Sequence, residues 1–301
     1  MMEPKFPEFK PVELADRGFL HELFWKYQPE TSELNFTNVF IWREHYHIQW
    51  SMHNQFLLIA CKSEAGNCFA LPPLGPGNRA QVSRELLQWM RENRGDKDPS
   101  IQRADQRLKD ELEPAGLFLI EPAREHFDYL YRSEDLIKLS GNKYHAKKNH
   151  LNKFRKTYQF SYQPLTTRLV DECLEVAELW CEAKRCHEDL DLMDEARAVR
   201  EILLNFEALK LQAGVIVVND RVEAFALGEM LNQNTAVVHI EKANPQIPQA
   251  FVVINQQFAE HEFSQVPFIN REQDLGDDGL RRAKKSYHPL RLVEKFRIRL
   301  K

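Results

Sequence analysis

Three residues that could transfer protons recur at short spacing in the second half of the sequence. Glu229 precedes a polar loop at residues 232–234, and His239 and Glu241 follow it. If the flanking segments are strands paired across this loop, Glu229 lies opposite Val237, and His239 and Glu241 share its face of the sheet. Carboxylates beside an imidazole can act as an acid/base group. An antiparallel sheet can equally expose such a face to solvent, so both interpretations stay open.

A second polar group follows a short apolar run. Asn270, Arg271 and Asp274 come directly after this run, and Lys284 lies on a short predicted helix further along. These side chains are candidates for binding an anionic substrate, because guanidinium and ammonium groups donate charge-assisted hydrogen bonds to oxyanions. The alternative for Arg271 is a structural pair with Asp274 inside a fixed turn.

Positive charge is concentrated in two segments of a chain whose formal net charge is −4. Residues 136–170 contain eight Lys or Arg and no Asp or Glu, and residues 280–301 contain nine against a single Glu. Such local fields attract anions even when the net charge repels them. The candidate phosphate contacts of the first segment are Lys143, Lys147, Lys148 and Arg155. The alternative is a solvated linker helix, but we predict that both segments line one groove.

Composition limits the class of protein. With 301 residues, 43% hydrophobic and 29% charged, the chain has an ordinary globular composition and is long enough for two domains. No apolar run reaches the length of a membrane helix, and no signal peptide is recognisable. Five irregularly spaced cysteines are expected to be reduced thiols, and no metal-binding signature is found. These features predict a cytoplasmic protein.

Hydrophobic periodicity predicts the same order of elements twice. In the second half, we expect helices at residues 167–186, 193–211, 248–263 and 277–286, and strands at 214–218, 222–231, 235–241, 266–270 and 291–300. In the first half, we expect helices at 15–25, 37–45, 79–91 and 104–112, and strands at 46–50, 56–61, 68–71, near 101 and at 117–121. A basic helix that begins near Ser140 connects the halves and packs through Tyr144, Leu151, Phe154 and Tyr158.

This order resembles the GNAT acyltransferase fold, repeated in tandem. Four blocks are similar to the C-terminal domain of phosphatidylglycerol lysyltransferases, a group related to the FemABX aminoacyltransferases: LNFTNVFIW at residues 34–42, KLSGNKYHAKKNHLNKF at 138–154, INREQDLG at 269–276, and the run at 279–289. The resemblance implies an α+β protein of two tandem GNAT domains at residues 1–135 and 161–301, joined by a connecting helix at 136–160.

The resemblance also implies a reaction. It suggests transfer of an aminoacyl group from aminoacyl-tRNA to an amine or hydroxyl acceptor, which is an anionic lipid headgroup or a small molecule. In this fold a tyrosine near Tyr287 protonates the leaving group, so Tyr287 is expected to act with Glu229, His239 and Glu241. The structural alternative for Tyr287 is an anchor at a helix end.

Two other functions remain open. Acyl-CoA is the less favoured donor, because residues 241–250 contain no glycine and two prolines where GNAT enzymes cradle the CoA pyrophosphate on backbone N–H groups. No firm cofactor is expected. The alternatives are therefore an acyl-CoA-dependent N-acyltransferase and a non-catalytic module that binds nucleic acid or another anion.

Overall fold

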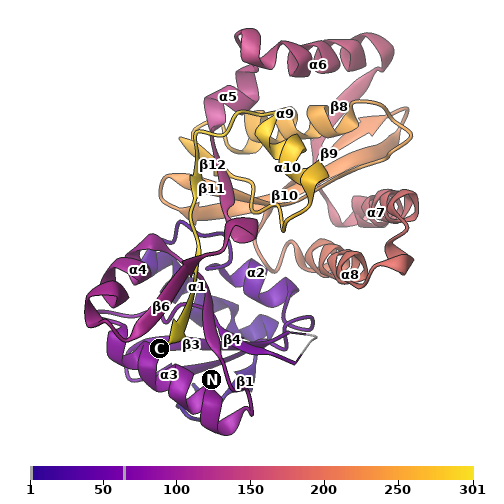
Figure 1. Ribbon diagram of the computed structural model, residues 1–301. Coiled ribbons are helices and arrows are strands. Elements are labelled where there is room, and N and C mark those ends of the chain that lie inside the picture. The colour runs from indigo at the N-terminus through magenta and orange to yellow at the C-terminus, as the bar shows by residue number, and fades with distance from the viewer. Residues whose placement is uncertain (1–2, 64–65) are drawn as a thin grey trace. The chain divides into compact units, whose positions relative to one another are not determined.

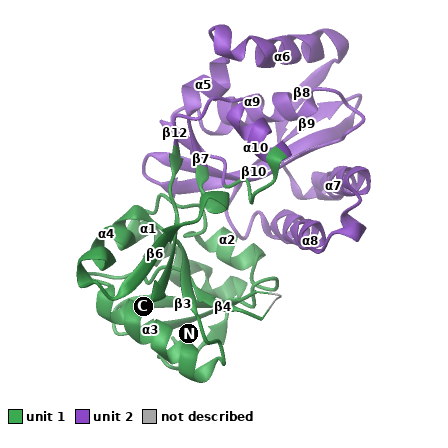
Figure 2. Ribbon diagram, viewed as in Figure 1, with its two compact units in different colours: residues 1–128, 273–278, 292–301 green, residues 129–272, 279–291 purple. Residues whose placement is uncertain are grey.

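The computed structural model describes residues 3–63 and 66–301, and the chain divides into two compact units (Figure 1, Figure 2). Unit 1 comprises residues 1–128, 273–278 and 292–301, and unit 2 comprises residues 129–272 and 279–291. The main chain therefore passes from one unit to the other four times. Each unit contains one seven-stranded mixed sheet.

Unit 1 is built on the strand order β1-β2-β3-β4-β5-β14-β6. Its strands are β1 (Lys10–Pro11), β2 (Gln49–His53), β3 (Phe56–Lys62), β4 (Cys68–Ala70), β5 (Ser100–Ala104), β6 (Phe118–Pro122) and β14 (Phe296–Leu300). Its α-helices are α1 (Arg17–Tyr27), α2 (Phe36–Ile41), α3 (Ala80–Asn93) and α4 (Gln106–Leu112). In α3, Val82, Leu86 and Met90 recur at helical spacing and pack against the sheet in one core cluster with Ile101 and Ile298.

Unit 2 has the strand order β13-β7-β12-β11-β10-β9-β8. Its strands are β7 (Asp128–Arg132), β8 (Phe160–Pro164), β9 (Gln212–Val218), β10 (Arg221–Asn232), β11 (Thr235–Ala243), β12 (Phe268–Asn270) and β13 (Arg291–Val293). Its α-helices are α5 (Ser133–Lys138), α6 (His145–Thr157), α7 (Val170–Lys184), α8 (Leu190–Asn205), α9 (Ala250–Glu262) and α10 (Asp278–Lys285).

Helices cover both faces of the central strands of unit 2. On β11, Glu241 bonds to Asn255 of α9, whereas the next residue, Lys242, lies over the Trp180 ring of α7 and pairs with Glu195 of α8. Successive strand residues point to opposite faces, so α9 covers one face and α7 with α8 the other. Figure 1 shows the same arrangement around β10.

The predicted C-terminal strand at residues 291–300 is wrong. The chain forms β13 in the sheet of unit 2, breaks at Glu294 and Lys295, and then forms β14 in the sheet of unit 1. β14 lies between β5 and β6, the position at which β7 stands in unit 2, between β12 and β13. Apolar residues recur in both strands, and only Glu294 interrupts the series of Leu292, Phe296, Ile298 and Leu300. This single interruption does not reveal the change of sheet.

A buried lysine holds the three segments of unit 1 together. The Nζ atom of Lys295 lies 2.6 Å from Glu33 and 2.6 Å from Asp128, and it also contacts Gln273 at 3.4 Å. Asp128 in turn accepts hydrogen bonds from the backbone N–H and hydroxyl of Ser32. Lys295 and Asp128 are fully buried. One ammonium group therefore links the chain segments that end at residue 128, begin at 273 and begin at 292.

Two of the five cysteines are not free. Cys181, near the end of α7, forms a disulfide with Cys186, because the left-handed conformation of Arg185 turns the chain back at the end of the helix. The expectation that all five cysteines are reduced is wrong for this pair. Cys61, Cys68 and Cys173 are free and buried.

Candidate functional site

The hairpin of β10 and β11 places Glu229 opposite Val237, as the sequence predicts. The predicted three-residue loop is wrong: Asn232 pairs with Thr235 across a two-residue turn, and an irregularity between Met230 and Asn232 restores the expected register. A second irregularity pairs Leu227 with Ile240 and Gly228 with Val238, so that His239 is the extra residue of a bulge. Bulges re-aim a side chain out of the regular pattern.

His239 lies between two carboxylates. One ring nitrogen of His239 is 3.2 Å from Oε1 of Glu229, and the other is 3.0 Å from Oε1 of Glu272. The imidazole is fully buried, and the Glu229 and Glu272 side chains are only 7% and 17% exposed. The alternative of a solvent-exposed face is therefore wrong for Glu229 and His239. We refer to Glu229, His239 and Glu272 as the carboxylate–histidine cluster.

The backbone around the cluster is adapted to these contacts. Glu272 adopts a left-handed conformation with φ of 54°, which costs a non-glycine residue energy. The Asn270 side chain holds this turn by accepting the Glu272 N–H at 2.8 Å. Next to Glu229, Gly228 approaches the opposite strand so closely that a Cβ there would lie 2.4 Å from the Val237 carbonyl oxygen. The unfavourable backbone conformation of Glu272 and the close approach at Gly228 both lie beside the carboxylate–histidine cluster.

The cluster makes stability depend on pH. Burial disfavours the imidazolium, but hydrogen bonds to Glu229 and Glu272 outweigh it and raise the pKa of His239 to about 9 from its ordinary 6.5. A raised pKa gives stability that is fully present below pH 6.5 and is lost as pH rises through 9.

We therefore expect the free energy of unfolding to fall by a few kcal/mol more in the wild type than in His239→Gln between about pH 6.5 and 9. Urea denaturation at constant ionic strength measures the difference. His150→Gln, which replaces an exposed histidine of α6, is the matched control and should follow the wild type. If the free energy of unfolding depends on pH in the same way in the wild type and in His239→Gln, the cluster does not contain an imidazolium.

Glu241 does not join His239 but forms a second group with Arg271. Its carboxylate accepts hydrogen bonds from Nη2 of Arg271 and from Asn255 at 2.8 Å. The Arg271 guanidinium lies over the Tyr287 ring, 4.9 Å from its centroid, and Nζ of Lys147 lies 4.0 Å from the same centroid. Because Arg271 and Glu272 are consecutive, this Arg271–Tyr287 group adjoins the carboxylate–histidine cluster along the chain.

Tyr287 is held as a neutral phenol. It is 5% exposed, and burial raises its pKa above the ordinary value, while the neighbouring Arg271 charge opposes the rise. Its carbonyl oxygen accepts a hydrogen bond from the Tyr144 hydroxyl at 3.0 Å. At neutral pH the Tyr287 hydroxyl therefore carries a proton that it can donate.

The other polar residues predicted to bind substrate, Asn270, Asp274 and Lys284, instead make contacts within the protein. Asn270 is buried in the turn described above, and Nζ of Lys284 donates to the carbonyl oxygen of Arg271. Asp274 is fully buried in unit 1 and pairs with Arg124 at 3.1 Å, so the pair of Arg271 with Asp274 is not formed. These contacts fix the backbone that carries Arg271 and Glu272.

Helix α6 exposes most of its basic side chains. Leu151 and Phe154 are buried, as is Tyr144 before the helix, so these three side chains pack on the protein as predicted, whereas Tyr158 after the helix is only half-buried. Within residues 3–63 and 66–301, no carboxylate pairs with the exposed cations Lys148, Lys153, Arg155 and Lys156, whereas Lys143 lies 3.5 Å from Asp135. The backbone at Lys143 contacts His288 of the second basic segment, and residues 292–301 of that segment belong to unit 1.

In the described part of unit 1, the central strands β3 and β4 carry no equivalent acid/base set. The described strands β3 and β4 carry mainly apolar residues, without a carboxylate or histidine. The glycine-containing loop at residues 75–78 is a tight connector rather than an open anion cradle. At its end, the Arg79 N–H binds Glu111 and the Ala80 N–H binds Asn78.

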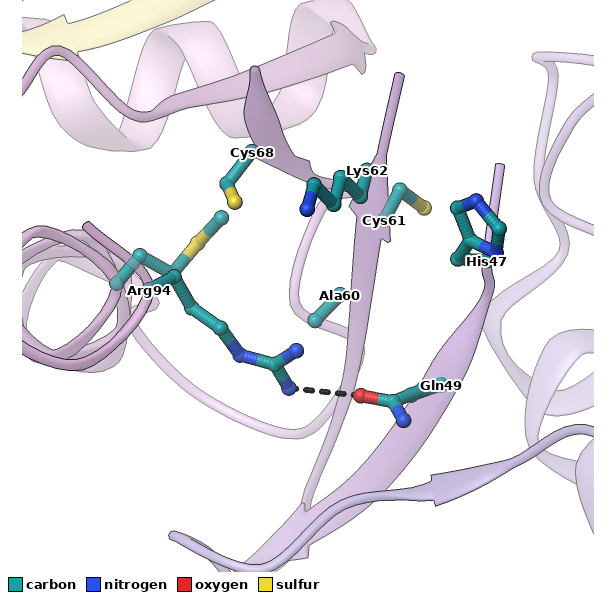
Figure 3. Close-up of a pocket in the computed structure, with 8 residues that line it drawn as sticks. His47, Gln49, Ala60, Cys61, Lys62, Cys68 and Arg94 are labelled. Atoms are coloured by element: carbon teal, nitrogen blue, oxygen red, sulfur yellow. Dashed lines mark hydrogen bonds between the residues drawn. The ribbon is translucent and has the colours of Figure 1, made fainter. Parts of the chain in front are cut away.

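A small pocket of about 80 Å³ lies in unit 1 (Figure 3). Its lining includes His47, Lys62 and Arg94 together with the Cys61 and Cys68 thiols, and Arg94 donates to Gln49 at 2.7 Å. The charged lining residues are exposed, and the lining contains no carboxylate to pair with His47. This pocket does not supply an acid/base pair.

Sequence reasoning missed Glu272, Asn255 and the inward position of Lys147. Glu272 lies between candidate residues in the sequence, but its left-handed backbone is visible only in the structure. Asn255, Gln256 and Gln257 form a polar run between the apolar residues 250–254 and 258–259 of α9 and are all buried, so this run could have indicated a buried polar site. A buried amide normally has a specific hydrogen-bond partner.

The two sheets, each with a parallel pair of strands near its centre, define a tandem GNAT protein of the α+β class. Residues 25–299 match the family described as phosphatidylglycerol lysyltransferase, C-terminal, and the chain belongs to this family.

Solved structures agree with this assignment. A conserved protein of unknown function from Bacteroides thetaiotaomicron is 34% identical over all of both chains, with a TM-score of 0.90. L-PGS from Bacillus licheniformis is 14% identical over 84% of each chain, with a TM-score of 0.58. FemX is 8% identical over 96% of each chain, with a TM-score of 0.55. The last two likenesses show the fold alone.

Searches of curated proteins give no match. Within the described part of the chain, no helix is both long enough and apolar enough to span a membrane. The family match over residues 25–299 makes the chain homologous to aminoacyltransferases of GNAT-like fold.

Proposed function

We propose that this protein transfers an aminoacyl group from an aminoacyl-tRNA to an amine or hydroxyl acceptor. The observation that carries the proposal is the buried His239 between Glu229 and Glu272, in a member of the phosphatidylglycerol lysyltransferase C-terminal family. Acyl transfer requires a group that removes the proton of the nucleophile and a group that protonates the leaving oxygen. The carboxylate–histidine cluster and Tyr287 are assigned these roles.

The reaction proceeds through attack of the acceptor nitrogen or oxygen on the ester carbonyl carbon. One carboxylate of the cluster takes the proton of the nucleophile. His239 stays protonated and stabilises the negative charge of the other carboxylate. The bond between the carbonyl carbon and the ribose oxygen breaks, and the ribose oxygen takes the Tyr287 proton. Transfer of the proton from the cluster to the phenolate through solvent completes the cycle.

Helix α6 supports tRNA as the source of the acyl group. Its exposed cations offer several contacts to phosphates, and each such contact releases counterions. By contrast, residues 241–250 lack the glycine-rich loop on which backbone N–H groups would bind CoA. The acceptor of the aminoacyl group is proposed to be an anionic lipid headgroup or a small molecule.

The direct test is incubation with a mixture of charged tRNAs carrying isotopically heavy amino acids, together with cell extract. Mass spectrometry should detect products that carry a heavy aminoacyl group only when the protein is present. Acyl transfer from acyl-CoA without transfer from tRNA contradicts the proposal and favours an acyl-CoA-dependent enzyme. Retention of tRNA without any transfer favours a binding module.

Charge reversal on α6 tests the tRNA contact. Lys148→Glu with Arg155→Glu is expected to weaken tRNA binding at low salt and to reduce the slope of log affinity against log salt by about 2. The control is Arg84→Glu with Arg91→Glu, because these exposed arginines have the same seven-residue spacing on α3. Equal loss of affinity in both double variants, measured by filter binding across a salt series, argues against α6 as the contact.

A further inference from the structure

The Arg271–Tyr287 group contains a buried donor without an acceptor. Nη2 of Arg271 binds Glu241, but Nη1 is buried and has no hydrogen-bond partner among the described residues. Leaving a charged donor unsatisfied in a protein interior costs more than leaving a neutral one. In native structures such an atom calls for an explanation, and a ligand that supplies the missing acceptor is one.

A second cation, the ammonium group of Lys147, lies over the ring of Tyr287. Nζ of Lys147 lies 4.0 Å from the centroid of Tyr287, and no carboxylate of the described residues forms an ion pair with it. Burial, together with the nearby Arg271 charge, lowers the pKa of Lys147. A cation over an aromatic face is stabilised, but the ring does not replace a hydrogen-bond acceptor for the ammonium group.

The local charge indicates what kind of ligand fits. Lys147 and Arg271 contribute two positive charges and Glu241 one negative charge, and Glu241 is already bound by Arg271 and Asn255. The group therefore lacks one negative charge with at least one oxygen that can accept a hydrogen bond from Nη1. A neutral hydroxyl compound supplies the acceptor but not the charge.

Lys147 joins this group to the basic helix. It lies on α6, and the Tyr144 hydroxyl before the helix bonds to the Tyr287 carbonyl oxygen. The N-terminal end of α6 is thus fixed to the residue that we assign as the acid. An anion bound by Lys147 and Arg271 lies against Tyr287, where the leaving oxygen takes its proton.

We propose that Lys147 and Arg271 form a binding subsite for a singly charged oxyanion of the substrate, held against Tyr287. The inference rests on the proposed transfer function for its place in the reaction, but binding itself can be measured without any transfer. Two kinds of group have this chemistry, a phosphodiester and a carboxylate. Dimethyl phosphate and N-acetylglycine represent them as soluble probes.

The test is protection of Lys147 from an amine-reactive ester, quantified by peptide mass spectrometry. Dimethyl phosphate or N-acetylglycine is expected to slow the modification of Lys147 at least fivefold, at concentrations on the order of 10 mM, as suits a small ligand. Lys26, exposed on α1 and outside both basic segments, is the internal control and should react at an unchanged rate. Sodium chloride at the same ionic strength and glycerol should give no protection.

The two probes separate the sources of the oxyanion. Protection by dimethyl phosphate alone assigns a phosphodiester, and protection by N-acetylglycine alone assigns a carboxylate. Absence of protection by either probe up to about 100 mM overturns the subsite, because millimolar affinity is the weakest that would be useful for a substrate group.

Two variants test the residues. Arg271→Gln should abolish protection of Lys147, and undiminished protection in this folded variant overturns the role of Arg271. Because Arg271→Gln leaves Glu241 without its ion pair and can fail to fold, Lys147→Gln provides an independent test. Dimethyl phosphate or N-acetylglycine, whichever protects, should bind Lys147→Gln at least tenfold more weakly by calorimetry. If Lys147→Gln binds the probe with the affinity of the wild type, the proposal is overturned.

The result is distinguishable from failure of the proposed function. Protection of Lys147 without any transfer from aminoacyl-tRNA leaves the oxyanion subsite standing and removes the transfer reaction. Aminoacyl transfer without protection of Lys147 supports the proposed reaction and contradicts the oxyanion subsite.

Discussion

Lys295→Met is expected to destabilise the protein by about 3 to 5 kcal/mol, because removing one partner of a buried ion pair leaves an uncompensated charge. Here the loss is shared by two carboxylates, Glu33 and Asp128, each 2.6 Å from the ammonium group. The lysine also joins three separate segments of unit 1, so its loss affects the whole unit. Urea denaturation monitored by circular dichroism measures the change in the free energy of unfolding.

The matched control is Arg297→Met, two residues further along, on β14. Arg297 is also basic but exposed, and its replacement should change stability by less than about 0.5 kcal/mol. If buried charge is the cause, adding Glu33→Gln and Asp128→Asn to Lys295→Met should recover part of the loss. A Lys295→Met variant as stable as Arg297→Met would show that the ammonium group contributes little.

Glu229→Gln and Glu272→Gln are expected to lower the rate of aminoacyl transfer by about 10²- to 10⁴-fold, the range associated with a positioned acid or base. Each change keeps the size of the side chain but removes its ability to accept a proton. Tyr287→Phe, which removes the proposed leaving-group proton, should reduce the rate within the same range. The measurement is single-turnover transfer from charged tRNA.

Glu223→Gln is the control for these variants. Glu223 lies on the same strand as Glu229 and accepts a hydrogen bond from Asn244 at 2.7 Å, which a glutamine oxygen can also accept. Its activity should stay within about threefold of the wild type, since an exchange that keeps this hydrogen bond costs little. Full activity of Glu229→Gln and Glu272→Gln, with melting temperatures near the wild-type value, would remove the carboxylate–histidine cluster from the mechanism.

The sequence was sufficient to predict the hairpin that carries the site. Val237 pairs with Glu229 as expected, because apolar alternation on both strands restricts the register. The bulge at His239 was not predictable, since it depends on which residues of the opposite strand approach, notably Gly228. For the same reason Glu241 was expected beside His239 but bonds to Arg271 instead.

Exchange between the sheets was the largest feature that sequence reasoning missed. β7 and α5 were not predicted, and β13 and β14 were taken as one strand, because an alternating pattern gives the face of a strand but not its neighbours. Lys295 gave no warning of this change, because a lysine is normally exposed unless it is paired. Its burial became interpretable only with Glu33 and Asp128, which are distant in sequence.

The position of β14 between β5 and β6 has a consequence for synthesis of the protein on the ribosome. Unit 1 begins the chain, yet its interior strand is translated after every residue of unit 2. Until then, β5 and β6 present unpaired backbone edges and the apolar core is incomplete. The N-terminal unit therefore cannot finish folding first, contrary to the usual order of domains on a growing chain. Nascent chains of this protein should need protection from aggregation until β14 has been translated and has left the ribosome.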